Sequence, residues 1–171
     1  MKVHYCHHCH HFINILIIIN NLAIFIANKA SEVFTSEYSN LVSVDVRIKI
    51  VRAQHLMHFH KKFDAISSFS SIEHDGLGRY GDPINPNGDF DAISEFHYLL
   101  NTDGILYLGI PISGNQGYIE GNYHRMYNYE RFYALIKDKF KLLYVVEDHY
   151  KFYNQEWNSW RNQPLFVLQK I

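Results

Sequence analysis

Residues 63–89 read FDAISSFSSIEHDGLGRYGDPINPNGD, and this stretch decides the predicted fold. Its first part, residues 63–70, is an apolar run that predicts a buried central strand. A loop rich in glycine and proline follows. Asp89 can then cap a helix that carries Phe90, Ile93, Phe96 and Leu100 on one face. The stretch therefore predicts a strand, a long loop and a helix in succession, as in an α/β sheet.

The same alternation of apolar runs and helical periods continues on both sides of this stretch. Further strands are predicted at residues 15–19, 32–38, 48–52, 104–110, 141–146 and 164–170, with another helix at 129–139. No helix fits between the last two strands, because residues 150–163 are polar, aromatic and irregular. A hairpin would therefore make the last strand antiparallel. The prediction is one Rossmann-like α/β domain over residues 12–171, with a mostly parallel sheet and helices on both faces.

Composition limits the partners that the chain is expected to bind. The 171 residues are 47% hydrophobic and can form one sizeable core. The formal net charge is -1 and the basic residues are scattered, so the charge pattern that binds a nucleic-acid backbone is missing. We expect no nucleic-acid partner, and a small molecule or a protein as the substrate.

The N-terminal segment raises the question of compartment. The apolar run at residues 12–27 contains three asparagines and is shorter than the ~20 residues of a membrane-spanning helix, so no membrane span is expected. Cys6 and Cys9, the two cysteines of the chain, build no disulfide framework, which favours a reducing compartment such as the cytoplasm. A secretory signal that ends near Ala27 or Ala30 is the alternative.

Residues 1–11 contain the run Cys6-His7-His8-Cys9-His10-His11, whose side chains can all bind a soft or borderline metal. A structural zinc site usually needs a second ligand pair well separated in sequence, and none is obvious. We therefore expect a disordered tail with adventitious metal affinity rather than a metal site.

The loop at residues 70–89 is the best candidate for an active site, because ligands of doubly wound sheets bind outside the carboxyl ends of the strands. Its charged residues and histidine include Glu73, His74, Asp75, Arg79 and Asp82. Glu73 and His74 could supply general acid–base chemistry, and Arg79 could hold a carboxylate in a bidentate fork or form an internal salt bridge. The alternative is a structural loop whose charged groups satisfy its own backbone.

Two further positions fall at the same edge of the predicted sheet. Glu37 ends the second strand, where Rossmann-like folds place an acidic residue that binds ribose hydroxyls; otherwise it is a surface carboxylate. His124 and Arg125 follow the fifth strand and could cover a substrate, or they could anchor the start of the next helix. All nine glycines lie between Gly76 and Gly121, which excludes a Walker loop or a Gly-x-Gly-x-x-Gly fingerprint at the first strand.

Three features together resemble class I S-adenosylmethionine-dependent methyltransferases: the central strand with Ser70-Ser71-Ile72-Glu73-His74, the strand that Gly104 starts, and Tyr123-His124-Arg125 before an aromatic-rich helix. Residues 70–89 are most similar to a methyltransferase-like family that is typified by Caenorhabditis proteins and known as a domain of unknown function. A weaker likeness extends over residues 30–146.

This resemblance implies S-adenosylmethionine as the cofactor and a methyl acceptor as the substrate. Residues 69–73 would lie beside the cofactor and residues 74–82 would face the substrate. By position, the implied cofactor contacts are Glu37, Ser70 and Ser71; the implied catalytic residues are Glu73, His74, Arg79 and Asp82; and the implied substrate contacts are Asp75, Tyr80, His124 and Arg125.

The chain departs from this pattern at Ile19-Asn20-Asn21-Leu22-Ala23, where such enzymes usually place a glycine-containing turn against the cofactor. A cofactor of roughly 27 non-hydrogen atoms at about 0.3 kcal/mol per atom would bind near micromolar concentration. Two positions forced into left-handed geometry cost about 3 kcal/mol, which predicts dissociation near 100 micromolar. We therefore expect a methyltransferase with an atypical cofactor loop; the alternative is a non-catalytic binding or scaffold protein with the same fold.

Overall fold

The computed structural model describes residues 11–16, 30–37, 42–43, 45–114, 117–146 and 163–171. Three regions discussed above lie outside these described residues: the tail at 1–10, the first turn at 19–23, and most of the connection at 150–163. Among the described residues, no helix is long and apolar enough to cross a membrane.

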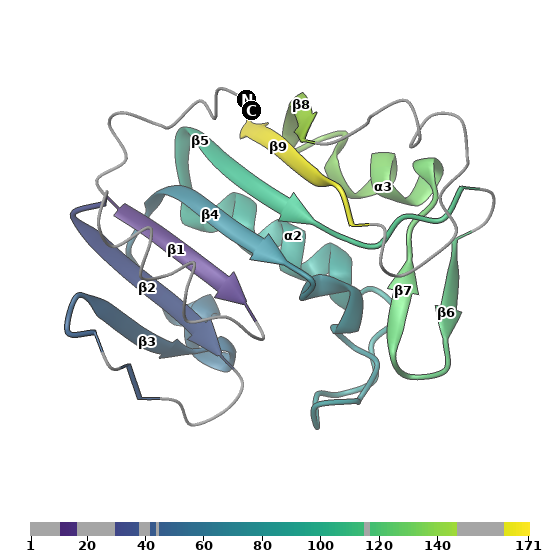
Figure 1. The fold of residues 1–171 in the computed structure, drawn as a ribbon, viewed down its shortest axis with the longest axis horizontal. Helices are drawn as coiled ribbons and strands as arrows, with labels where there is room; N and C mark the ends of the chain where they lie inside the picture. Colours follow the sequence, from purple (N-terminus) through teal and green to yellow (C-terminus); the bar gives the residue numbers. More distant parts are fainter. Residues whose placement is uncertain (1–10, 17–29, 38–41, 44, 115–116, 147–162) are drawn as a thin grey trace.

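A seven-stranded sheet forms the centre of the molecule (Figure 1), in the order β3-β2-β1-β4-β5-β9-β8. Its strands are β1 (His11–Leu16), β2 (Glu32–Glu37), β3 (Ile48–Arg52), β4 (Phe63–Phe69), β5 (Leu100–Gly109), β8 (Phe140–Val146) and β9 (Leu165–Lys170). The first five pair in parallel, whereas β9 runs antiparallel to both of its neighbours. The mostly parallel sheet, the central β4 and the antiparallel last strand are confirmed.

The first strand begins at His11 rather than at residue 15, so that part of the prediction was displaced. The cause is the apolar run itself. Residues 12–19 are almost continuously apolar, and periodicity cannot locate a strand boundary within such a run. The strand at 104–110 likewise begins earlier, at Leu100, directly after a helix.

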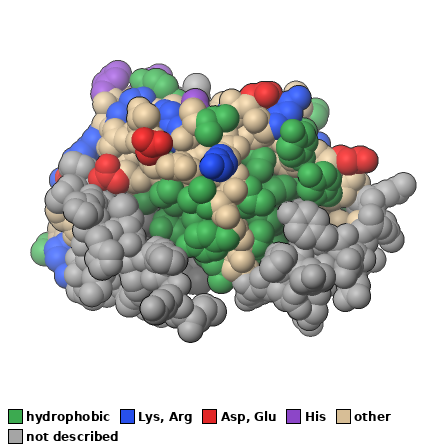
Figure 2. All heavy atoms as spheres, turned by 90° about the horizontal axis from the view of Figure 1, so that it is seen from above, with side chains coloured by type: hydrophobic (Ala, Val, Ile, Leu, Met, Phe, Trp, Pro, Cys, Tyr) green, Lys and Arg blue, Asp and Glu red, His purple; other side chains and the backbone are tan. Residues whose placement is uncertain are grey.

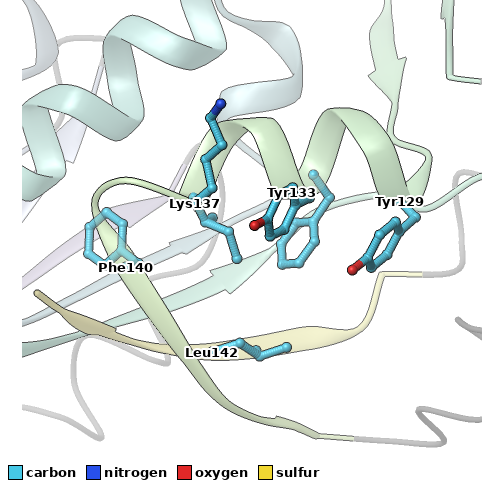
Figure 3. Close-up of a pocket in the computed structure, with 7 residues that line it drawn as sticks. Tyr129, Tyr133, Lys137, Phe140 and Leu142 are labelled. Atoms are coloured by element: carbon cyan, nitrogen blue, oxygen red, sulfur yellow. The ribbon is translucent and has the colours of Figure 1, made fainter.

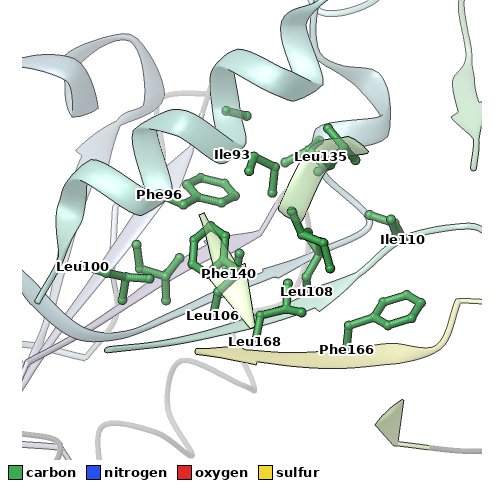
Figure 4. Packing of buried hydrophobic residues seen from close by; sticks show 14 of the residues in the cluster. Ile93, Phe96, Leu100, Leu106, Leu108, Ile110, Leu135, Phe140, Phe166 and Leu168 are labelled. Carbon is green, nitrogen blue, oxygen red and sulfur yellow. The ribbon is translucent and has the colours of Figure 1, made fainter. Parts of the chain in front are cut away.

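Two α-helices, α2 (Gly88–Leu99) and α3 (Tyr129–Ile136), pack on the sheet through one hydrophobic cluster. Figure 4 shows Ile93 and Phe96 of α2 and Leu135 of α3 above Leu106 and Leu108 of β5. Both helices therefore lie on the same face of the sheet, behind it in Figure 1. Helices on the second face stay a prediction.

The start of α2 differs from the prediction that Asp89 caps it. The residue before the helix is Asn87, and Asp89 lies inside the first turn with its side chain completely buried. A buried carboxylate requires a partner, and the guanidinium of Arg131 in α3 provides one. Asp89 therefore joins the two helices.

A short hairpin, β6 (Tyr118–Glu120) and β7 (His124–Met126), forms a second sheet that the sequence analysis did not anticipate. It stands beside the carboxyl ends of β4 and β5 in Figure 1, where β7 contacts the 3-10 helix η2 (Ile72–His74). Another 3-10 helix, η1 (Ala53–His58), follows β3. The hairpin brings His124 and Arg125 to the loop after β4.

The outer surface carries charges of both signs. Seen from above in Figure 2, lysine and arginine side chains lie among acidic ones over one half of this face, and apolar side chains gather on the other half. The basic residues visible there form no continuous patch.

Candidate active site

The strand order reverses between β1 and β4, and this is where doubly wound sheets form their ligand crevice. The register sets Ile15 of β1 opposite Ser36 and Leu16 opposite Phe69. The next residue of β2 is Glu37 and the residue after Phe69 is Ser70. The backbone therefore brings the ends of β2 and β4 to either side of the end of β1.

Ser70 turns the chain sharply out of β4. Its φ of 51° lies in the left-handed region, which costs an ordinary residue roughly 1–2 kcal/mol. Three contacts hold it there: its N–H donates to the carbonyl of Gly109 at 2.9 Å, its Oγ donates to Glu73 Oε1 at 2.8 Å, and Gln163 Nε2 donates to its Oγ at 3.3 Å. Strained backbone of this kind clusters at functional sites.

Gly109 allows this close approach of β4 and β5. A Cβ at Gly109 would lie 2.1 Å from Cδ2 of the Phe69 ring, so no other residue fits under that ring without movement. The ring of Phe69 and the peptide of Ser70 are thereby both placed by the end of β5.

Glu73 lies in η2 with its carboxyl group in the protein interior. Its side chain is 1% exposed, and Oε2 has no hydrogen-bond partner among the described residues. Burial raises the pKa of Glu73 from 4.5 to about 7; its own backbone and the Ser70 hydroxyl partly oppose the shift, and the charge of Asp75 adds to it. The carboxyl group therefore keeps its proton to a higher pH than an ordinary glutamate does.

His74 is orientated by the hairpin. Its Nδ1 contacts the carbonyl oxygen of Tyr123, which can only accept, so Nδ1 carries the proton. Nε2 then faces Glu73 Oε1 at 3.6 Å. Burial lowers the pKa of His74, and the positive charges of Arg79, His124 and Arg125 lower it further against the opposing hydrogen bond to Tyr123. The ring is neutral at pH 7, with the lone pair of Nε2 towards Glu73.

The rest of the loop is built from its own backbone. Gly76 has a φ of 74°, and a Cβ there would lie 2.1 Å from the carbonyl oxygen of Asn85. The carboxylate of Asp82 accepts from the N–H groups of Gly76 at 2.7 Å, Gly78 at 3.2 Å and Tyr80 at 3.2 Å. Both oxygens of Asp82 thus bind the loop itself, which is the structural role weighed in the sequence analysis.

Arg125 holds the loop through hydrogen bonds from the protein interior. Its side chain is 1% exposed and donates to the carbonyls of Asp75 and Asn85, the latter at 3.1 Å. Nε lies 3.9 Å from Asp89 Oδ1, and the same carboxylate accepts two hydrogen bonds from Arg131 at 3.0 and 2.8 Å. Arg125 therefore faces the carbonyls of the loop, and its two η nitrogens are used in holding that loop.

Arg79 and two tyrosines form the exposed rim of the site. The guanidinium carbon of Arg79 lies 5.0 Å from the ring centroid of Tyr123 and 5.5 Å from that of Tyr80, and Nη1 donates to the carbonyl of Tyr123 at 3.4 Å. The ring of His74 contacts the rings of Tyr80 and His124 edge-on. His124 in turn lies 3.3 Å from Glu120.

The structure thus brings together most of the residues that the sequence singled out, in two groups. Ser70, Glu73, His74, Arg79, Tyr80 and His124 surround the end of β4, and Asp82 and Arg125 support them from within the loop. Ser71 is buried, and its carbonyl accepts from the N–H of His74 at 3.0 Å. Glu37 stands across the end of β1, at the end of β2.

Four residues contribute to the site although the sequence analysis gave them no role in it: Asp89, Tyr123, Tyr127 and Arg131. Tyr127 is fully buried, and its hydroxyl has no partner in the described part of the chain. Burial raises the pKa of Tyr127 well above 10, and the charges of Asp89 and Glu73 act in the same direction. Tyr123 contributes a backbone carbonyl, for which a sequence contains no signal.

Two hollows are lined by described residues outside the loop. One of about 330 Å³ is lined by the hairpin, Arg125 and Arg131. The other, of about 230 Å³, lies between α3 and β8, where Tyr129, Tyr133, Lys137 and Leu142 surround it (Figure 3). Residues 70–89 line neither of them.

The strand order, with one antiparallel strand next to the last in the sheet, defines the class I methyltransferase-like fold. The chain belongs to the family described as Caenorhabditis protein of unknown function, DUF268, whose model matches residues 12–159. A search of curated proteins found no match.

Solved structures of methyltransferases share the fold at low sequence identity. The N-methyltransferase NodS from Bradyrhizobium japonicum WM9, in complex with S-adenosyl-L-homocysteine, has a TM-score of 0.66 at 10% identity, over 95% of this chain and 78% of NodS. The 1,6-didemethyltoxoflavin-N1-methyltransferase of Burkholderia thailandensis has a TM-score of 0.65 at 11% identity, over 92% and 70%. An S-adenosylmethionine-dependent methyltransferase of Clostridium acetobutylicum has a TM-score of 0.62 at 11% identity, over 92% of this chain and 83% of the Clostridium protein.

Proposed function

We propose that this protein is an S-adenosylmethionine-dependent methyltransferase whose acceptor binds at the end of β4 and gives its proton to Glu73. One observation carries the proposal. A buried carboxyl group, with a pKa of about 7 and one oxygen that has no hydrogen-bond partner among the described residues, lies at the strand reversal of a methyltransferase-like fold. Leaving such a group without a partner is costly, and perturbed pKa values of this kind cluster at functional sites.

The residues that we assign to the cofactor, Glu37, Ser70 and Ser71, follow or end the strands on either side of the strand reversal. Glu37 ends β2, where a carboxylate can accept from the two hydroxyls of a ribose. Ser70 and Ser71 follow β4 on the other side, and the positive φ of Ser70 turns the chain away from the end of the sheet. When bound, S-adenosylmethionine supplies a methyl group on a sulfonium, as an electrophile. The crystal structures of NodS and of the Burkholderia enzyme, which share this fold, contain S-adenosylhomocysteine, the form of the cofactor that has lost its methyl group.

The side chains at the end of β4 can remove the proton that methyl transfer releases. As the lone pair of an acceptor N–H or O–H group forms the bond to carbon, that group must lose its proton. Glu73 can take the proton at Oε2, and a pKa near 7 suits a base at neutral pH. His74 Nε2 lies 3.6 Å from the other oxygen of the same carboxyl group, which is too far for a hydrogen bond, so the ring of His74 lies beside the proposed base without taking part in the proton transfer.

Cofactor binding by the full chain tests the proposal. In equilibrium dialysis with labelled S-adenosylmethionine, we expect saturable binding that S-adenosylhomocysteine displaces. Glu37→Ala should weaken binding at least tenfold. Glu32→Ala is the matched control, since Glu32 is at the other end of the same strand, away from the proposed cofactor site, and pairs with Lys49 and Lys61. Absence of binding up to millimolar concentration would refute the proposal.

A non-catalytic scaffold is the second candidate, and one observation favours it. No glycine precedes Gly76, so the turn after the first strand lacks the residue that lets backbone approach a cofactor closely. The two candidates differ in one further result. A methyltransferase transfers the labelled methyl group to an acceptor and loses this activity in Glu73→Gln, whereas a scaffold transfers none.

A further inference from the structure

Arg79 holds a positive charge in a fixed place at the rim of the site. Rings of Tyr80 and Tyr123 flank its guanidinium at 5.5 and 5.0 Å, and one of its five N–H groups donates to the carbonyl of Tyr123. The remaining donors point to no carboxylate among the residues that the structure describes. These contacts restrict the guanidinium, which lowers the conformational cost of binding an anion.

Other arginines in the described ranges show the contrast. Arg47 pairs with Asp45 at 2.5 Å, and Arg125 and Arg131 share Asp89. The acid nearest to Arg79 along the chain, Asp82, turns both carboxylate oxygens to backbone N–H groups of the loop. The carboxylate of Asp82 is therefore used within the loop, and no carboxylate among the described residues pairs with the guanidinium of Arg79.

The charge around Arg79 selects the kind of anion. Its other cationic neighbours contribute little at neutral pH, because burial keeps His74 uncharged and Glu120 lies 3.3 Å from His124. The single charge of the guanidinium matches a singly charged carboxylate, which a guanidinium binds through two parallel hydrogen bonds. A doubly charged phosphate would leave excess negative charge. The tyrosine rings beside the guanidinium favour a ligand with a flat apolar body.

The position of Arg79 relates this anion site to Glu73. Arg79 Nη1 and His74 Nδ1 both contact the carbonyl oxygen of Tyr123, and His74 Nε2 faces Glu73. One histidine ring therefore separates the guanidinium from the proposed base. We infer that the methyl acceptor is a small molecule with a carboxylate and a flat apolar body, held by Arg79 so that its reacting atom lies beside Glu73. This inference rests on the proposed methyltransferase function.

Benzoate is a suitable probe, with inorganic phosphate and benzyl alcohol as comparisons at constant ionic strength. The full chain is titrated and the ¹⁵N resonance of Arg79 Nε is followed by NMR. We expect saturable shifts with benzoate and at least tenfold weaker binding of the other two. Arg79→Gln should weaken benzoate binding at least tenfold, and Arg79→Lys should give an intermediate loss because it keeps the charge without the fork. In the variants, ring resonances of Tyr123 and His74 report binding.

Arg47→Gln is the control, because it removes a guanidinium at the far edge of the sheet, before β3, and should leave benzoate binding unchanged. Equal or tighter phosphate binding, or benzoate affinity that Arg79→Gln does not reduce, would overturn the inference. S-adenosylhomocysteine binding is measured on the same samples and should be the same for wild type and Arg79→Gln. If benzoate binds through Arg79 but S-adenosylhomocysteine does not bind at all, the methyltransferase proposal fails while the carboxylate site stands.

Discussion

Glu73 carries its carboxyl group into the protein interior, and the free energy of that burial depends on pH. The folded pKa of about 7 lies above the ordinary value of 4.5. The protonated form is therefore favoured by folding: its stabilising contribution is complete below about pH 4.5 and is lost as the pH rises through 7. The difference of pKa corresponds to about 3 kcal/mol.

We expect Glu73→Gln to remove this pH dependence. The amide keeps the shape of the side chain and can still accept from Ser70 Oγ, but it cannot ionise. Relative to wild type, the variant should gain about 3 kcal/mol of unfolding free energy between pH 4.5 and 8. Urea denaturation at several pH values measures this. A difference between variant and wild type that stays constant over the range would contradict the raised pKa.

At the level of elements, the loop after β4 depends on glycine for two separable reasons. Gly76 and Gly81 both have positive φ, of 74° and 82°, but a Cβ at Gly81 meets nothing within 4 Å, whereas one at Gly76 meets the carbonyl of Asn85. Gly81→Ala should therefore cost roughly 1–2 kcal/mol, the price of left-handed geometry alone. Gly76→Ala should cost clearly more. Chemical denaturation of both variants measures the difference, and equal losses would show that the contact with Asn85 is easily relieved.

The junction of α2, α3 and the hairpin depends on Asp89. This carboxylate is completely buried and forms an ion pair with Arg131, and Arg125 Nε lies 3.9 Å from Asp89 Oδ1. Asp89→Ala leaves buried guanidinium charge without its partner, and we expect a loss of about 3–5 kcal/mol. Asp138→Ala is the matched control, because that side chain is 78% exposed beside Lys137 and should change stability by less than about 1 kcal/mol. Thermal unfolding measures the stability of both variants. If Asp89→Ala and Asp138→Ala lose similar amounts of stability, Asp89 has no special role at this junction.

These elements also show how far a sequence predicts a site. The loop was recognisable because Gly76, Gly78 and Gly81 interrupt it and adjacent Glu73 and His74 suggest chemistry. The role of Arg125 in holding the loop could not be recognised in the sequence. Its partners are backbone carbonyl groups, and because every residue has one, the sequence does not indicate which of them are bound. The hairpin was missed because its strands are only three residues long, with β6 exposed throughout and only Arg125 and Met126 buried in β7, and so short a pattern leaves no apolar alternation to detect. Burial of Glu73 is a property of the assembled fold, so its raised pKa could not be predicted.

For the whole molecule, affinity for the cofactor is the quantity that decides between enzyme and scaffold. The turn at residues 19–23 lies outside the described residues, so its effect stays a prediction: dissociation of S-adenosylmethionine near 100 micromolar, about a hundredfold weaker than a well-formed site. Calorimetry on the full chain measures this value. Dissociation near 1 micromolar that Glu37→Ala abolishes would show that side chains at this turn do not obstruct the cofactor.

The position of β9 has a consequence for how the protein is made. This strand lies between β5 and β8, yet of the seven it is the last to leave the ribosome. Until it emerges, β5 and β8 are both open edges of a nascent chain, and exposed edges invite pairing with other chains. The emerging polypeptide therefore cannot complete its sheet until β9 is available. Translation pauses that hold β9 inside the ribosome should prolong dependence on chaperones, whereas pauses after β9 has emerged should not, because the strand can then pair with both β5 and β8.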